Sequence, residues 1–385
     1  MKLKLSLYRA FSFDNLMFYA IQIIFLTNVK NFDISDVLLL ESFYWGCQIF
    51  LQIPTPYIID KLGNKKSSIL GSLCWIIAIL LYLVSSSIWY IIIGEFVRAL
   101  GASILGTVST PITYQLLKKN KLQRKYKKIE GNAVFLYFLI DSFLSFISGF
   151  LFNVNSYLPM FVVLLTCVVA FILSCSLDDV PNEDTVKPTF KDYKKIIKNK
   201  FVVSILLYSF FVGAILSLPA SYNKVFLVDI GISPEWLGII ISLLTLVNAL
   251  SAKFSDEISK IFKDKTITMI SVICLSSFVL LGILYFYHNL ITLIILILPI
   301  FIVQNTLKQP YRIYLKYYIN EKVPSRYITR VLSIYFIIEN IGRTLLLFIV
   351  GICAKLYSVG TIYIFVGILT LIPVCLATKR MNENL

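Results

Sequence analysis

The sequence predicts an all-α membrane protein with twelve transmembrane helices in two six-helix halves. Two observations lead to this fold class. Hydrophobic residues make up 58% of the 385-residue chain and charged residues 15%, whereas soluble domains contain about 45–50% apolar and about 25% charged residues. Apolar stretches long enough to cross a bilayer also recur along the whole chain. No polar stretch between them is long enough for a soluble catalytic domain.

Twelve spans follow from the apolar runs between polar breaks. The chain starts with a basic segment, and the apolar run after it has no small-residue cleavage site. We therefore expect a first transmembrane helix there and no cleaved signal peptide. The expected spans are 10–29, 37–59, 67–86, 88–117, 129–152, 158–176, 201–228, 235–254, 266–287, 290–318, 329–354 and 358–378.

The Lys and Arg residues indicate the orientation of these spans. With the N-terminus inside, 26 of the 36 fall in inside segments, two in outside loops and eight within spans. Because cytoplasmic loops carry an excess of Lys and Arg, both termini are expected in the cytoplasm, below a plasma membrane. The excess of Lys over Arg points to a bacterium. The net charge of +15 thus indicates contact with membrane lipid, above all by the loop 118–128, and not with nucleic acid.

The longest inside loop separates an N-terminal half, 1–176, from a C-terminal half, 201–385. This linker, 177–200, begins acidic and ends basic, and its second half fits an amphipathic helix on the membrane surface. Two halves of six spans are typical of transporters whose substrate site lies between structural repeats near the midplane.

The sequence gives no sign of a metal, cofactor or enzymatic site. The seven cysteines lie in apolar segments without CxxC spacing, and the one histidine, His288, lies at a helix edge. We interpret the cysteines as small core residues. The chain has no P-loop and no His-rich motif. We therefore expect no metal, no cofactor and no enzymatic activity.

One inside loop carries a recognisable motif. Asp60, Gly63 and the basic pair Lys65 and Lys66 follow span 2, and they resemble the signature loop of the major facilitator superfamily, written G-x-L-A-D-R-x-G-R-K. The first Gly of that pattern is a Pro here. The resemblance implies a gating loop whose Asp contacts a helix N-terminus or a basic partner and closes the inner gate. Gly63 permits a tight turn, and the lysines hold the loop at the anionic inner face.

Other stretches agree with this resemblance. The segments 13–19 and 41–44 are similar to those of a branch of bacterial superfamily members, and 98–101 is similar to the family's membrane-embedded Arg motif. The loop 322–333 resembles the one before span 11, whereas the second-half copy of the signature loop, 251–265, lacks its Gly. Drug–proton antiporters of the family carry a Gly-Pro motif in span 5, but span 5 here has no Pro.

Ionisable residues within the spans are the candidate sites for proton coupling and substrate binding. Each costs about 2.5–3.5 kcal/mol at the bilayer centre, so they must face one another or a wet cavity. We expect seven such residues at similar depth: Glu95, Arg98, Asp141, Lys308, Arg312, Glu339 and Arg343.

Spacing predicts pairs among them. Glu95 and Arg98 stand at i,i+3 and Glu339 and Arg343 at i,i+4 on their helices, and a bridge from Arg98 to Asp141 is a further expectation. The basic ladder of span 10, which Lys308 and Arg312 begin, needs an acidic partner, and Glu339 is the nearest in depth. Permanent structural pairs and pairs that break during transport both fit these spacings.

Polar stripes mark one face of each of the first two spans. Asp14 and Gln22 share a face of span 1. The family resemblance, in which a functional acid often lies in span 1, implies Asp14 as the preferred proton site among residues near a membrane edge. Span 2 shows Glu41, Tyr44, Gln48 and Gln52 on one face. Such stripes point inward, where they either line a polar cavity or form hydrogen bonds between helices. For Glu41, an exposed rim position is the alternative.

The leading functional interpretation is a secondary transporter that moves a small molecule by alternating access. The embedded acids, the aromatic content of 15% and the family resemblance favour proton-coupled efflux of an amphiphilic, drug-like compound by an antiporter. The missing Gly-Pro motif and the basic ladder of span 10 favour the alternative of uptake or facilitated diffusion of a small anionic solute. A membrane sensor or immunity protein that binds without transport is a further alternative. We expect the chain to act as a monomer.

Overall fold

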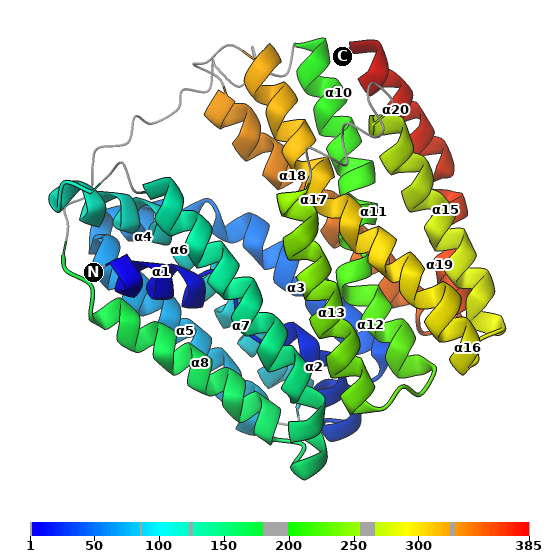
Figure 1. Ribbon diagram of the computed structural model, residues 1–385, viewed down its shortest axis with the longest axis horizontal. Coiled ribbons are helices and arrows are strands. Elements are labelled where there is room, and N and C mark those ends of the chain that lie inside the picture. Colours follow the sequence, from blue (N-terminus) through cyan, green and yellow to red (C-terminus); the bar gives the residue numbers. More distant parts are fainter. Residues whose placement is uncertain are drawn as a thin grey trace. The chain divides into compact units, whose positions relative to one another are not determined.

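The structure is a computed structural model that describes residues 2–84, 87–122, 126–179, 199–254, 266–323 and 328–384. Within these ranges all regular secondary structure is helical (Figure 1). Eleven of the described helical segments are long and apolar enough to cross a membrane, and Phe18–Val29 is a shorter apolar one. The predicted fold class, an all-α membrane protein, is confirmed.

Contacts divide the chain into two units. Unit 1 comprises Met1–Asp33, Phe43–Thr185 and Ser233–Leu246. Within it, α5 packs along both α6 and α8, and α1 packs along α7 and α8. Its elements are α1 (Lys2–Phe11), α2 (Phe18–Ile24), the π-helical turn η1 (Phe25–Val29), α4 (Pro54–Leu62), α5 (Asn64–Val84), α6 (Ile88–Lys119), α7 (Tyr126–Val154) and α8 (Leu158–Cys175).

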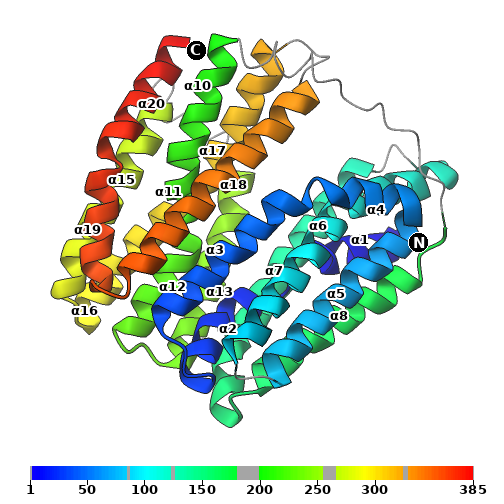
Figure 2. The same cartoon turned by 180° about the vertical axis from the view of Figure 1, so that it is seen from behind.

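Unit 2 comprises Ile34–Ser42, Val186–Ile232 and Val247–Leu385. Within it, α15 packs along α19, and α10 packs along α20 (Figure 2). Its elements are α10 (Lys200–Tyr208), the π-helical turn η3 (Ser209–Gly213), α11 (Ala214–Ser217), α12 (Pro219–Asp229), α15 (Thr266–Phe286), α16 (Leu290–Thr292), the π-helical turn η5 (Leu293–Ile297), α17 (Leu298–Lys322), α18 (Ile328–Cys353), α19 (Val359–Leu369) and α20 (Leu371–Asn384).

Two helices contribute to both units. The first part of α3 (Ile34–Leu51) belongs to unit 2, and the first part of α13 (Pro234–Lys253) belongs to unit 1. Ser42 Oγ donates to the carbonyl oxygen of Thr344 at 3.0 Å. Each unit thus takes one segment from the other side of the linker 177–200. Most of that linker, 180–198, lies outside the described residues, and so does the amphipathic helix expected there.

The first expected span, 10–29, is broken in the structure. Helix α1 begins at Lys2 and ends at Phe11, and α2 begins only at Phe18. Between them Met17 has a φ of 62°, in the left-handed region. Asp14 explains the break, because its side chain accepts a hydrogen bond from the next backbone N–H and so competes with helical hydrogen bonding.

The second expected span, 37–59, also ends early. Helix α3 ends at Leu51, and a separate short helix, α4, starts at Pro54, where the missing N–H of proline suits a first turn. The helices of spans 3 to 11 begin and end within four residues of their predicted bounds. Most of the degenerate second-half loop, 255–265, lies outside the described residues, and so does the part 324–327 of the loop 322–333.

Candidate functional site

A buried ion pair lies within α6, in unit 1. Glu95 and Arg98 are three residues apart, so their side chains share a helix face. The Arg98 Nη2 lies 2.7 Å from Glu95 Oε2, and Arg98 Nε donates to the same oxygen at 2.9 Å. Both side chains are 0% exposed. Loss of either partner would leave an uncompensated charge in the interior.

Two further side chains bind the Glu95 carboxylate. Gln22 of α2 donates from Nε2 to Glu95 Oε1 at 3.0 Å, and the Tyr82 hydroxyl of α5 donates to the same oxygen. Gln22 is expected to point inward and either line a polar cavity or form a hydrogen bond between helices. In the structure it forms an interhelical hydrogen bond. The sequence does not single out Tyr82 among 23 tyrosines, because its partner lies on another helix.

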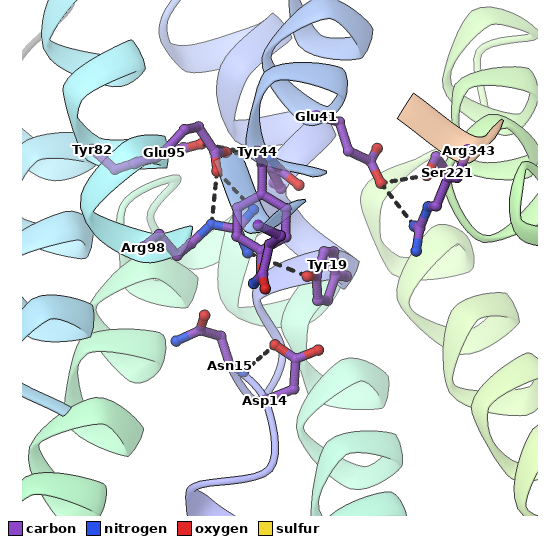
Figure 3. A network of polar contacts seen from close by, with 12 residues as sticks. Asp14, Asn15, Tyr19, Glu41, Tyr44, Tyr82, Glu95, Arg98, Ser221 and Arg343 are labelled. Atoms are coloured by element: carbon purple, nitrogen blue, oxygen red, sulfur yellow. Dashed lines mark hydrogen bonds and ion pairs between the residues drawn. The ribbon is translucent and has the colours of Figure 1, made fainter. Parts of the chain in front are cut away.

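Aromatic rings surround the guanidinium of Arg98 (Figure 3). Its Cζ lies 3.6 Å from the ring centroid of Tyr44, 4.4 Å from that of Phe18 and 5.4 Å from that of Tyr19. Cations are attracted to such ring faces. Arg98 Nη1 also donates to Tyr19 Oη at 3.3 Å, and Gln48 Nε2 donates to Tyr44 Oη at 3.0 Å.

Two carboxylates bind the backbone at the break in the first span. The N–H of Asn15 donates to Asp14 Oδ1 at 2.8 Å, and the N–H of Met17 donates to Asp141 Oδ1 at 2.8 Å. Met17 directly precedes α2, whose first N–H groups lack helical partners, and a negative charge is favourable there. The structure thus brings both predicted acids, Asp14 and Asp141, to one short backbone segment.

A second ion pair lies in unit 2, between two helices. Arg312 Nη2 of α17 lies 2.7 Å from Glu339 Oε1 of α18. The Arg312 side chain is 31% exposed and that of Glu339 only 4%. The side chains of Tyr335 and Tyr311 lie beside this pair, and that of Tyr335 interacts with the Glu339 carboxylate.

Glu41 and Arg343 form a further ion pair in unit 2. Arg343 Nη2 of α18 lies 3.5 Å from Glu41 Oε1 of α3, and the Ser221 hydroxyl of α12 donates to the same carboxylate oxygen (Figure 3). Glu41 is 6% exposed and Arg343 is 7% exposed. Glu41 is therefore buried and does not occupy the exposed rim position that was its alternative.

The cations of α17 form a basic stripe, which we define as Lys308, Arg312 and Lys316. The i,i+4 spacing places them on one helix face. Lys308 is half-buried and Lys316 is exposed. The charges of Lys224 and Glu339 act on Lys308 together with that of Arg312. Cations outnumber acids in this set, so the stripe is a region of positive potential within a membrane-spanning helix.

A buried hydrogen-bonded chain, which sequence reasoning did not identify, joins four helices of unit 2. The Tyr363 hydroxyl donates to Asn223 Oδ1 at 2.7 Å, Asn223 Nδ2 donates to Gln304 Oε1 at 3.0 Å, and Gln304 Nε2 donates to Ser277 Oγ at 2.9 Å. Each residue stands alone in an apolar stretch, and the stretches lie far apart in sequence. The spacing of these residues therefore does not predict that they are hydrogen-bonded to one another.

The predicted gating loop lies between α4 and α5. Asp60 and Lys66 are exposed and Lys65 is half-buried. Gly63 has a φ of 82°, a conformation that strains any residue with a Cβ, so the tight turn expected of this glycine is present. Gln52, the last residue of the polar stripe in span 2, is half-buried just after the end of α3.

Comparison with known proteins identifies the family. The family model of the Major Facilitator Superfamily matches residues 7–307. The chain belongs to the Major Facilitator Superfamily. The resemblance predicted from the signature loop is confirmed, and this superfamily member is a multi-pass membrane transporter.

The similar proteins are also described as transporters. An uncharacterized transporter of Buchnera aphidicola subsp. Baizongia pistaciae (strain Bp) is 26% identical over 279 residues, which are 69% of this chain and 68% of the relative. The uncharacterized MFS-type transporter YxaM of Bacillus subtilis (strain 168) is 22% identical over 395 residues, covering 96% of this chain and 93% of the relative. The crystal structure of the nucleoside transporter NupG matches with a TM-score of 0.82 at 12% identity, covering 98% of each chain.

Proposed function

We propose that this transporter moves a small solute with an acidic group by alternating access, and that a proton moves with the solute. The observation that carries the proposal is the accessibility of Arg312. Its charge lies within a membrane-spanning helix and is paired with a buried carboxylate, yet 31% of its side chain is exposed. A partly exposed arginine side chain at this depth is suited to bind a carboxylate or phosphate.

The surrounding charges favour an anionic ligand. Lys308 and Lys316 extend the basic stripe on both sides of Arg312, and Lys224 adds a further positive field at Lys308. Cations inside a membrane protein are costly unless they are paired. An anionic solute would supply the missing negative charge, whereas a cationic solute would add to the repulsion.

Glu339 offers a route for proton coupling. Its Oε1 accepts a hydrogen bond from Arg312 at 2.7 Å, and the side chain of Tyr335 lies beside the same carboxylate. A proton on Oε2 would neutralise the carboxylate and weaken its attraction for Arg312. The guanidinium would then be available to the anionic group of the solute. Proton and solute would occupy the site together, which is the requirement for symport.

Efflux of an amphiphilic cation is the second candidate, and one observation in unit 1 favours it. Asp14 and Asp141 both lie at the break in the first span. The ring of Phe13 lies beside that of Tyr137, with 4.6 Å between centroids, and the charges of both acids act on Tyr137. Carboxylates next to aromatic rings are suited to bind an organic cation.

Transport into proteoliposomes with an imposed pH gradient tests both candidates. The panel contains organic anions, amino acids, sugars and cationic amphiphiles. Nucleosides are included because of the likeness to NupG. We expect an anion to drive proton entry, and we expect Glu339→Gln to remove proton movement while binding remains. Asp14→Asn and Asp141→Asn serve as matched variants in unit 1.

Each outcome separates the alternatives. A cation that exchanges for protons, with loss of exchange in Asp14→Asn or Asp141→Asn, would replace the first candidate by the second. A solute that crosses without protons would indicate facilitated diffusion. Ligands that bind but do not cross would indicate a sensor or immunity protein.

A further inference from the structure

Two adjoining hollows lie at one end of unit 2, on either side of α20. The first, of about 470 Å³, lies between α15 and α20, and its walls are almost entirely apolar. The second, of about 730 Å³, is lined by Lys200, Leu376, Lys379, Arg380 and Glu383. Lys379 and Glu383 line both hollows, so the apolar hollow continues directly into a charged one.

We propose that these hollows bind one anionic phospholipid, with an acyl chain along α15 and α20 and the phosphate at Lys379. This site is separate from the residues assigned to transport, so it stands whether or not the proposed solute and coupling are correct.

The walls of the apolar hollow suit an acyl chain. Val272 and Leu275 of α15 face Val374 and Cys375 of α20 across it. Hydrogen bonds at the same interface hold the two helices in place: the Thr378 hydroxyl donates to Ser271 Oγ at 2.9 Å. Burial of each methylene group of an acyl chain in such an apolar hollow is favourable.

The charges around the second hollow suit an anionic headgroup. Lys200, Lys379 and Arg380 are exposed cations, and Glu383 is the acid among the lining residues. A fourth cation, Lys322 of α17, lies with its Nζ 5.5 Å from the ring centroid of Phe201, the residue after Lys200. The net charge of the lining is therefore positive even with Glu383 ionised.

The predicted orientation places this end of unit 2 at the cytoplasmic face, where anionic lipids are attracted to basic segments. A zwitterionic lipid would fill the apolar hollow equally well, but its headgroup would gain less from the cations. Selectivity between the two lipids therefore measures the headgroup contact, and occupancy of the hollow measures the acyl contact.

Native mass spectrometry of the full chain, released from nanodiscs of equimolar phosphatidylglycerol and phosphatidylcholine with identical acyl chains, tests the proposal. We expect the wild-type chain to retain phosphatidylglycerol preferentially. Lys379→Gln with Arg380→Gln should lower that preference by about fivefold for each charge removed. The control Lys61→Gln with Lys355→Gln removes the same charge from exposed positions that line neither hollow, and it should leave the preference unchanged.

A second variant tests the acyl chain. Cys375→Phe fills the apolar hollow without a change of charge, and it should reduce retention of both lipids. Soluble glycerol phosphate should not compete, because it lacks the acyl contact. Equal retention of the two lipids by the wild-type chain, an equal loss in the control variant, or full competition by glycerol phosphate would overturn the proposal. Size-exclusion profiles identify any variant that does not fold.

Discussion

The ion pairs of the two units differ in how they are held. Glu95 and Arg98 lie on one helix, are 0% exposed and are enclosed by aromatic rings. Arg312 and Glu339 lie on two helices, and Arg312 is 31% exposed. A pair within one helix keeps its geometry when that helix moves, whereas a pair between helices breaks when one helix shifts against the other. This difference supports our proposal of a transport role for the second pair, and we propose a structural role for the first.

The largest effect is expected from Arg98→Met. The change leaves the Glu95 carboxylate buried without its ion-pair partner, which costs about 3–5 kcal/mol of the free energy of unfolding. Thermal unfolding in detergent measures this loss. Unfolding is monitored by the reactivity of the thiols of Cys74 and Cys167, which are buried in the folded protein. Adding Glu95→Gln should restore most of the stability. If the double variant is as unstable as the single one, packing and not charge holds this region together.

Arg312→Met should cost less stability, about 1 kcal/mol, because Lys308 acts on the same carboxylate and still offsets its charge. Transport of the solute found in the panel should nevertheless be lost. Arg312→Lys, which keeps the charge but not the bidentate geometry, should recover only part of the transport rate. A normal rate in Arg312→Met would remove the basic stripe from the proposed mechanism.

Tyr82→Phe tests whether the buried pair of unit 1 contributes to stability or to transport. It removes one hydrogen bond to the Glu95 carboxylate, and such bonds contribute about 1 kcal/mol or somewhat more to stability. Transport should remain near the wild-type rate, because the ring and the ion pair stay in place. A large loss of transport with little loss of stability would move the buried pair from a structural to a functional role.

Tyr19→Phe should have the smallest effect, about 0.5 kcal/mol. The hydroxyl accepts a 3.3 Å hydrogen bond from Arg98, whereas the ring face that attracts the cation is kept. The same unfolding measurement applies. A loss as large as that of Tyr82→Phe would show that the guanidinium depends on its hydrogen bonds more than on the rings around it.

The sequence predicts the fold class, most span boundaries and the contact between Glu95 and Arg98, because these depend on local patterns of apolar and charged residues. It does not predict that Arg343 contacts Glu41. The spacing of Arg343 from Glu339 is equally suited to a pair within α18, and only tertiary structure brings residues 302 positions apart into contact. Asp14 is a predicted proton site, but the periodicity of span 1 gives no sign that the helix breaks there.

The division of α3 and α13 has a consequence for how the chain matures during synthesis. Unit 1 includes Ser233–Leu246, so its packing is complete only after more than half of the chain has left the ribosome. Unit 2 in turn includes Ile34–Ser42, which is synthesised early and lacks its final neighbours until the last helices arrive. Domains that are continuous in sequence fold in order from the N-terminus. In this transporter unit 1 can complete its packing only after Leu246 has been made, and unit 2 only after the last helices. A truncated chain that ends at the linker would therefore leave unit 1 without Ser233–Leu246.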